Sequence, residues 1–193
     1  MNRPPESSRS NRLKLILLAG IFVLPLLLGW LAHRFGWAPG TTANYGSLVQ
    51  PRELPDVALV GRDGARARLS AWRGKWILLH FDSARCDAYC EKKLYFMRQI
   101  RRALGNDMRR VERVWLVTGD SWPAAPLVEA ISGTHVLRAN NELSVFFAGG
   151  GTSVDHLFLI DPLGQWMMSF PRDPDPSKIL KDLQRLMKYS GAG

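Results

Sequence analysis

Cysteine is scarce in this chain of 193 residues, which contains two, Cys86 and Cys90. Both lie in the stretch HFDSARCDAYCEKK, residues 80–93, and three residues separate them. The chain also lacks internal repeats and low-complexity tracts, so the sequence does not predict a repeat architecture. The close pair leaves three roles open: a structural disulfide, a dithiol that exchanges electrons, or two ligands of a metal ion.

Charged residues are absent from residues 15–32, LILLAGIFVLPLLLGWLA. As a helix this run would be roughly 27 Å long, close to the hydrocarbon thickness of a bilayer. It has no polar face, which a helix packed in a soluble core would need. A cleaved signal peptide would end in small residues, whereas this run ends in GWLAHRFGW. We therefore expect an uncleaved transmembrane helix at residues 15–32.

Acidic residues are also few before this helix. Residues 1–14 contain one, Glu6, and four basic residues, Arg3, Arg9, Arg12 and Lys14. By the positive-inside rule, residues 1–14 stay in the cytoplasm and the chain after the helix is exported. The sequence thus predicts a single-pass protein of the bacterial inner membrane with a periplasmic domain. That compartment is oxidising, so a close cysteine pair there forms a disulfide unless another component reduces it.

The whole chain has 17 acidic against 26 basic residues, which gives a net charge of +9. Much of the excess lies in six arginines of one segment: Arg98, Arg101, Arg102, Arg109, Arg110 and Arg113. They indicate either a solvated helix face with its loop, or a docking surface for an acidic protein or anionic lipid headgroups. Nucleic acid is not an expected partner, because the predicted topology places this segment outside the cytoplasm.

The chain after the apolar run divides into a tether and a domain. Residues 33–54 are predicted to be the tether, because their first part is rich in Gly, Pro, Thr and Asn without a sustained period. In the predicted domain, residues 55–193, strand and helix patterns alternate. Hairpin signals surround GRDG and PLG, strands are expected at 75–81, 113–120 and 135–139, and helices at 86–104, 125–131, 141–146 and 174–190. This alternation predicts an α/β sandwich with helices on both faces of a sheet.

With a cysteine pair opening a helix and LIDPLG in a late hairpin, residues 55–190 resemble the thioredoxin-like fold. The three-residue spacing resembles that of the Sco/SenC family, membrane-anchored copper proteins that help to assemble the dinuclear copper centre of cytochrome c oxidase. That family's third ligand is a histidine, often within Val-Asp-His, which Val154, Asp155 and His156 match. The resemblance implies a copper ion bound by Cys86, Cys90 and His156, and a role in delivering copper or reducing the acceptor's cysteines. It implies cytochrome c oxidase subunit II, or another extracytoplasmic redox protein, as the partner.

The residues themselves also support chemistry at the pair. Positions i and i+4 of a helix share one face, with Cα atoms roughly 6 Å apart, which suits a disulfide or a shared soft cation. A helix amino terminus and the neighbouring Arg85 favour thiolate, so Cys86 is expected to be the more acidic thiol and Cys90 the more buried one. The family's cysteines are commonly followed by proline, whereas Asp87 and Glu91 follow them here.

Other functions stay open at this point. One is a thiol-disulfide oxidoreductase with a different client, including cytochrome c maturation. Ordinary members of that class place a cis-proline before the late hairpin, and this chain has no proline between Pro126 and Pro162. A scaffold with a vestigial cysteine pair is another, and peroxidase activity, with Ser83 three residues before Cys86, is a third. A purely structural bridge across so short a loop would stabilise the fold little.

For the histidines and for Asp82 the sequence predicts a role less specifically than for the cysteine pair. His156 is either a metal ligand or a hydrogen-bonding residue at a strand start. His80, in the central strand, is expected to be a satisfied interior residue, and His135 has no predicted partner. Asp82 is expected to cap a loop or to orient a neighbouring group.

Overall fold

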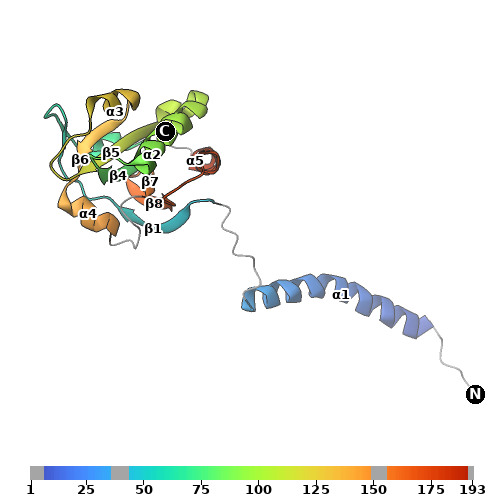
Figure 1. Ribbon diagram of the computed structural model, residues 1–193. Helices are drawn as coiled ribbons and strands as arrows, with labels where there is room; N and C mark the ends of the chain where they lie inside the picture. The colour runs from blue at the N-terminus through green and yellow to red at the C-terminus, as the bar shows by residue number, and fades with distance from the viewer. Residues whose placement is uncertain (1–6, 36–43, 149–155, 191–193) are drawn as a thin grey trace, which may run out of the picture. The chain divides into compact units, whose positions relative to one another are not determined.

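The computed structural model describes residues 7–35, 44–148 and 156–190, and the chain divides into two units, residues 1–43 and 44–193. The first unit contains helix α1 (Ser7–Arg34), shown in Figure 1. Within the described chain, Asn11–Ala32 is the one helical segment long and apolar enough to cross a membrane. The predicted apolar helix is therefore confirmed, and it extends beyond residues 15–32 at both ends.

The second unit is built on one sheet of eight strands in the spatial order β1-β8-β7-β4-β5-β6-β2-β3. The strands are β1 (Ser47–Glu53), β2 (Leu59–Gly61), β3 (Arg66–Ala67), β4 (Trp76–Ser83), β5 (Val111–Thr118), β6 (His135–Arg138), β7 (Leu157–Ile160) and β8 (Gln165–Phe170). Strands β4, β5 and β6 run parallel to one another, and the other neighbours are antiparallel. The long central strands β4 and β5 are apolar over most of their length because both of their faces are covered.

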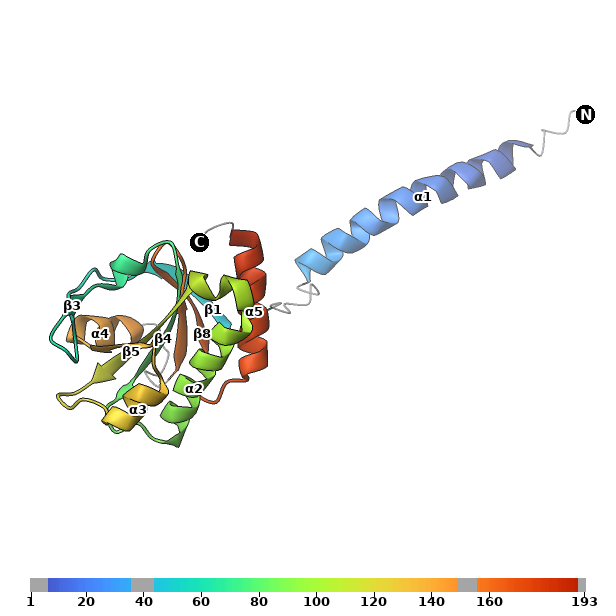
Figure 2. The same ribbon diagram turned by 90° about the horizontal axis from the view of Figure 1, so that it is seen from above.

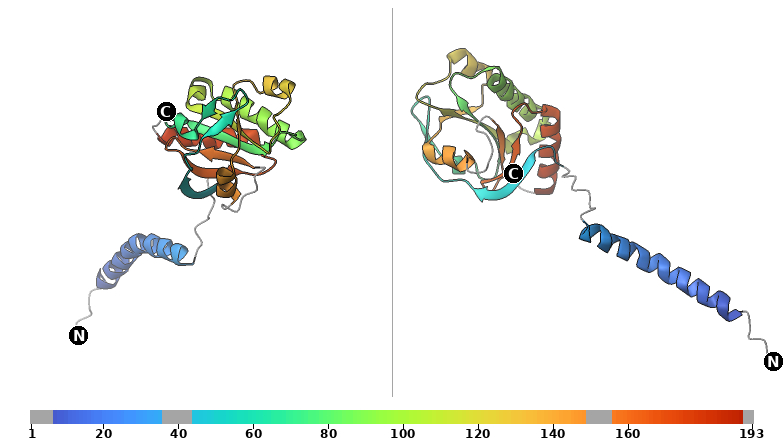
Figure 3. Two further views of the ribbon diagram at one scale, coloured as in Figure 1. Left: turned by 90° about the vertical axis from the view of Figure 1, so that its left-hand side faces the viewer. Right: turned by 60° about the horizontal axis from the view of Figure 1, so that its bottom comes forward.

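Helices cover both faces of this sheet, as Figures 2 and 3 show. Helices α2 (Ala88–Ala103) and α5 (Pro176–Ser190) lie side by side on one face, which α3 (Ala125–Ala130) also borders, and α4 (Asn141–Ala148) covers the other. Two 3-10 turns, Leu69–Trp72 and Gly105–Arg110, complete the elements. The predicted α/β sandwich is thus confirmed.

Alternate residues of β4 belong to different cores, as the two-residue period of a strand requires. Leu78 packs in the core under α2 and α5, whereas Leu79 packs with Phe147 of α4. In the described part of the chain both cores consist of residues of this second unit, which therefore has a hydrophobic interior of its own.

Strand β1 lies inside the range predicted as a tether, residues 33–54, so the tether boundary was placed too late. The folded unit begins at Asn44 rather than at residue 55. The β1 side chains are mostly exposed, and the strand is defined by its pairing with β8, for example Ser47 with Ser169. The carboxylate of Asp182 in α5 anchors its start by accepting hydrogen bonds from the Tyr45 and Gly46 N–H groups, at 2.8 and 2.9 Å.

Candidate functional site

Cys86 and Cys90 are joined in a disulfide at the beginning of α2, with their Cα atoms 5.1 Å apart. Cys86 is half-buried, whereas Cys90 is fully buried against the core under α2. The predicted difference in burial between the two thiols is therefore confirmed. After reduction, Cys86 would be the sulfur that a partner reaches first.

Helix α2 begins at Ala88 and not at Cys86 as predicted, because Asp87 is its N-cap. The backbone of Asp87 is extended, and its carboxylate accepts a hydrogen bond of 2.9 Å from the Cys90 N–H. The first N–H groups of a helix have no carbonyl acceptor within the helix, and a side chain that accepts a hydrogen bond from one of them satisfies that group. The aspartate at the position where the resembled family commonly has proline thus fixes the helix start between the two cysteines.

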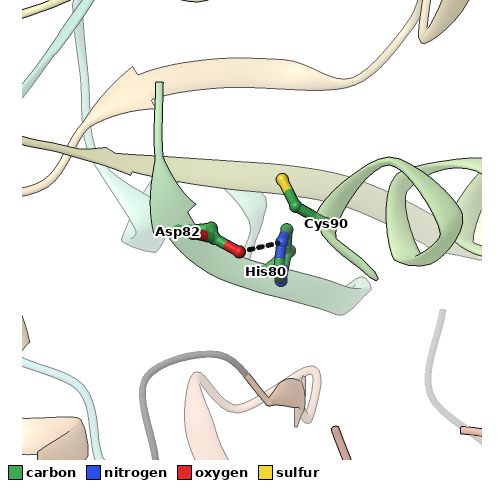
Figure 4. Close-up of side chains that lie close together, drawn as sticks. All are labelled: His80, Asp82 and Cys90. Carbon is green, nitrogen blue, oxygen red and sulfur yellow. Dashed lines mark ion pairs between the residues drawn. The ribbon is translucent and has the colours of Figure 1, made fainter. Parts of the chain in front are cut away.

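His80 and Asp82 lie beneath Cys90, on the face of β4 that α2 covers (Figure 4). His80, Asp82 and Cys90 each offer one donor atom, and these atoms lie within 4.8 Å of one another. Residues 78, 80 and 82 of a strand share one face, so the same alternation that buries Leu78 under α2 directs His80 and Asp82 toward Cys90. Sequence reasoning had not predicted this group: the alternation places His80 and Asp82 on one face of the strand, but it does not say which helix covers that face.

The His80 imidazole is fully buried, as expected of an interior residue, and it contacts Asp82 and the His156 backbone. Neither ring nitrogen has hydrogen-bond geometry to a partner in the described part of the chain. Its Nε2 lies 3.5 Å from Oδ2 of Asp82. Burial lowers the pKa of His80 below its ordinary value of 6.5; Asp82 opposes this shift, while the charge of Lys93 adds to it. His80 is therefore neutral at pH 7, the form that can accept a proton or ligate a metal ion.

Asp82 makes the capping contact that was expected of it, and a role in orienting His80 stays a prediction. Its Oδ1 accepts a hydrogen bond of 2.7 Å from the Ser83 N–H at the end of β4, and its Oδ2 faces His80. Burial alone would raise the pKa of Asp82, but its contacts with His80 and the Ser83 N–H and the charge of Lys93 outweigh it, so the pKa lies below 3.8. Lys93, one helical turn after Cys90, is itself buried, with 1% of its surface exposed. The buried sulfur of Cys90 thus lies in a region that combines one carboxylate, one lysine side chain and one neutral imidazole.

His156 is half-buried immediately before β7, and the next residue, Leu157, pairs with His80 across the β4–β7 ladder. The His156 backbone also lies against the His80 ring. Val154 and Asp155 of the matched motif lie outside the described residues. In the disulfide form, the three-donor group of the described chain contains His80 and not His156. A ligand role for His156 in the reduced form stays a prediction.

The remaining residues singled out from the sequence lie apart from this group. His135 begins β6, where Nε2 lies 3.3 Å from Oε2 of Glu112 and the ring packs on Trp72. Ser83 at the end of β4 and Arg85 on the loop before Cys86 are both exposed. The Ser83 carbonyl accepts a hydrogen bond of 3.3 Å from the Cys86 N–H, which holds the loop to the end of β4.

The arrangement supports two kinds of chemistry. Two sulfurs on one helical turn can bind a soft cation such as Cu(I), and a nearby imidazole is a suitable third ligand. The same sulfurs can exchange with another disulfide, with Cys86 accessible and Cys90 buried beside groups that can hold a proton.

Comparison with known proteins gives a family and a fold. A family model described as "Transmembrane-like, thioredoxin-like, C-terminal domain" matches residues 76–190. No curated protein sequence matches the chain. Among solved structures, apo Sco1 from Thermus thermophilus is 20% identical with a TM-score of 0.60, over 76% of this chain and 99% of its own. Copper-bound ScoI from Bradyrhizobium japonicum is 18% identical with a TM-score of 0.53, over 72% and 99%. A thioredoxin-family thiol:disulfide interchange protein from Chlorobium tepidum is 19% identical with a TM-score of 0.57, over 70% and 96%.

Proposed function

Because the chain belongs to the transmembrane-like, thioredoxin-like C-terminal domain family, we propose that it is a membrane-anchored thioredoxin-like protein that serves the assembly of a copper-containing respiratory oxidase. The observation that carries this proposal is the cysteine pair, spaced by three residues, at the start of α2 in a domain that follows an apolar helix. The likeness in fold to Sco proteins, one of them with copper bound, supports it. Copper is here a cargo that the protein receives and passes on.

Each residue of the pair has a distinct part in this proposal. Cys86, the half-buried sulfur, is the one that contacts the partner, and Cys90, the buried sulfur, holds the cargo from the protein side. His156 is the proposed third ligand. The client we propose is cytochrome c oxidase subunit II or another extracytoplasmic redox protein, and the place of action is the periplasmic side of the inner membrane.

The decisive experiment is a titration of the reduced domain, residues 44–193, with Cu(I) in competition with a chelator of known affinity. We expect one Cu(I) per domain, and Cys86→Ser and Cys90→Ser should each abolish tight binding because one of two thiolates is lost. Ser83→Ala, at the exposed end of β4, is the matched control and should bind like the wild type. Absence of one-to-one binding in the wild type would refute the copper proposal.

A second function, disulfide reduction of a client, is favoured by a specific observation: the two cysteines are joined in a disulfide with one accessible and one buried sulfur. In this reaction the reduced Cys86 thiolate attacks the client's disulfide and releases one client thiolate. The Cys90 thiolate then attacks the Cys86 sulfur of the mixed disulfide, which forms the Cys86–Cys90 bond and releases the second client sulfur as a thiolate. The likeness in fold to the Chlorobium tepidum protein is consistent with it.

One further assay, read together with the Cu(I) titration, distinguishes disulfide reduction from copper delivery and from a non-catalytic scaffold. The reduced domain is mixed with a disulfide peptide that carries two closely spaced cysteines, and the client thiols released are counted. A reductase gives two thiols per domain without bound copper, a metallochaperone gives tight Cu(I) binding, and a scaffold gives neither.

A further inference from the structure

Four arginines converge at the C-terminal half of α2, on the sheet face that α2 covers. A pocket of about 340 Å³ lies there, and its wall includes Arg98, Arg101 and Arg102 of α2, Arg113 of β5, and Ser132 and Gly133 of the turn after α3. Figure 2 shows α2, β5 and α3 around this part of the domain. Arg98 follows Cys90 by eight residues, which is roughly 12 Å along a helix, so the pocket is separate from the cysteine pair.

Arg113 is the central residue of this pocket, and only 3% of its surface is exposed. Its Nη2 donates a hydrogen bond of 2.8 Å to the Ser132 carbonyl. Its Nε and Nη1 are buried and have no hydrogen-bond partner in the described part of the chain. A Cβ on Gly133 would lie 2.9 Å from Nη2, and Gly133 has a φ of +81°, so this turn is shaped to admit the guanidinium. The expected solvated face is therefore wrong for Arg113.

Like charges surround Arg113. Burial, together with the charges of Arg101, Arg98 and Arg102, lowers the pKa of Arg113 to about 10, and the charge of Glu112 acts against them. Glu112 belongs to the opposite face of β5, where its carboxylate is held by Lys75 at 2.5 Å and His135 at 3.3 Å. Arg113 is still charged at neutral pH, and a buried charge without a counter-ion is costly.

The neighbouring guanidiniums are held in place by backbone carbonyls. Arg98 Nη1 donates to the Ala130 carbonyl at 2.8 Å, and Arg101 Nε donates to the Val111 carbonyl at 2.7 Å. Each of these guanidiniums has further N–H groups beyond the one used. The pocket therefore presents several oriented cationic donors together with two buried donor nitrogens of Arg113 for which the described residues provide no acceptor.

We propose that this pocket is a binding site for an oxyanion of the phosphate class. A phosphate group offers acceptor oxygens in several directions, and guanidinium forks match pairs of them. It would supply both the missing counter-charge and the missing acceptors for Arg113. The phosphate can be free in solution or part of an anionic lipid headgroup, since both present the same oxygens. The proposal concerns a surface distinct from the cysteine pair and does not depend on the function proposed above.

The test is binding of two probes to the disulfide-bonded domain, residues 44–193, at 150 mM salt: inorganic phosphate by titration calorimetry, and phosphatidylglycerol vesicles by co-sedimentation. The main variant is Arg102→Gln, because Arg102 is exposed and its loss leaves the core intact. Arg109→Gln is the matched control, since it removes the same charge from an exposed position outside the pocket wall. Arg113→Lys tests the buried fork itself.

We expect saturable one-to-one phosphate binding that Arg102→Gln and Arg113→Lys each weaken by about tenfold or more, and that Arg109→Gln leaves within about twofold. The same pattern with vesicles alone supports the site and identifies the lipid as its source of phosphate. Equal weakening by Arg102→Gln and Arg109→Gln would show unspecific attraction to net charge and would overturn the proposal. Absence of binding to both probes by the wild type would also overturn it.

Discussion

Nε2 of His80 lies 3.5 Å from Oδ2 of Asp82, in the interior directly beneath the sulfur of Cys90. The ring is fully buried and, among the residues that the structure describes, its nitrogens have no partner with hydrogen-bond geometry, which is an unusual environment for a histidine. A buried polar group without full hydrogen bonding costs stability, so the state of His80 can be measured through the folding of the domain.

The first prediction concerns pH. The pKa of His80 lies below 6.5 in the folded domain, with burial as the main cause. Below pH 6.5 the imidazole of His80 binds a proton in the unfolded chain but stays neutral in the folded domain. The free energy of unfolding therefore falls as the pH falls. The limiting slope is about 1.4 kcal/mol per pH unit for one proton. Urea unfolding of the disulfide-bonded domain between pH 5 and pH 7.5 should show this slope, and His80→Leu should reduce it. Identical slopes in the two proteins would contradict the assignment.

The second prediction concerns the two thiols of the reduced domain. Cys90 is fully buried and Cys86 is half-buried at the positive end of α2. Iodoacetamide should therefore modify Cys86 at least about tenfold faster than Cys90, because alkylation needs an accessible thiolate. The rates are read by mass spectrometry of Cys86→Ser and Cys90→Ser, each with one remaining thiol. Equal rates would show that reduction exposes Cys90.

The third prediction separates copper binding from electron transfer. If His156 is the third ligand, His156→Ala should weaken Cu(I) binding by roughly a hundredfold or more and leave the disulfide free to form. His80→Asn is the comparison, because the structure places His80 and not His156 in the three-donor group. Loss of affinity in His80→Asn alone would transfer the ligand role to His80. Unchanged affinity in His156→Ala would eliminate His156 as a ligand.

The fourth prediction concerns the start of α2. The Asp87 carboxylate accepts the Cys90 N–H at 2.9 Å, so Asp87→Ala removes the N-cap. We expect a loss of about 1 kcal/mol in the free energy of unfolding, measured with urea on the disulfide-bonded domain. Asp87→Asn should stay within a few tenths of the wild type, since asparagine caps equally well. A similar loss in both variants would point to the charge rather than to the cap.

The fifth prediction concerns topology. Four basic residues precede the apolar run, against one acidic residue, so the domain is expected outside the cytoplasm. A reporter that is active only in the periplasm, fused after Gly193, should give activity. Activity of a cytoplasm-only reporter at the same position would reverse the orientation, and with it the argument that an oxidising compartment maintains the disulfide.

Much of the fold could be predicted because local patterns and packing agree in its centre. The run 75–81 became β4, and the stripe containing Ile179 and Leu183 became the buried face of α5. Strand β1 could not be predicted in this way, because Pro51, Arg52 and Glu53 give it no apolar alternation. Its pairing with β8 and the anchor at Asp182 exist only once the chain has folded.

In the candidate site, too, features set by local sequence could be predicted, and features set by tertiary packing could not. The cysteine pair is local, and its spacing by one helical turn already indicated that the two sulfurs lie together. The His80–Asp82–Cys90 group depends on which face of β4 is covered by α2, and this is a tertiary fact. The burial of Arg113 depends in the same way on the turn after α3.

Strand β1 also has a consequence for how copies of the domain behave beside one another. It forms one edge of the sheet, where its irregular register with β8 between Leu48 and Arg52 and its residues Pro51, Arg52 and Glu53 make a poor template for another strand. The opposite edge, β3, has only two residues, Arg66 and Ala67. Neither edge is a good template for an added strand. The folded domain should therefore resist edge-to-edge aggregation even when many copies are present at high density on one membrane surface.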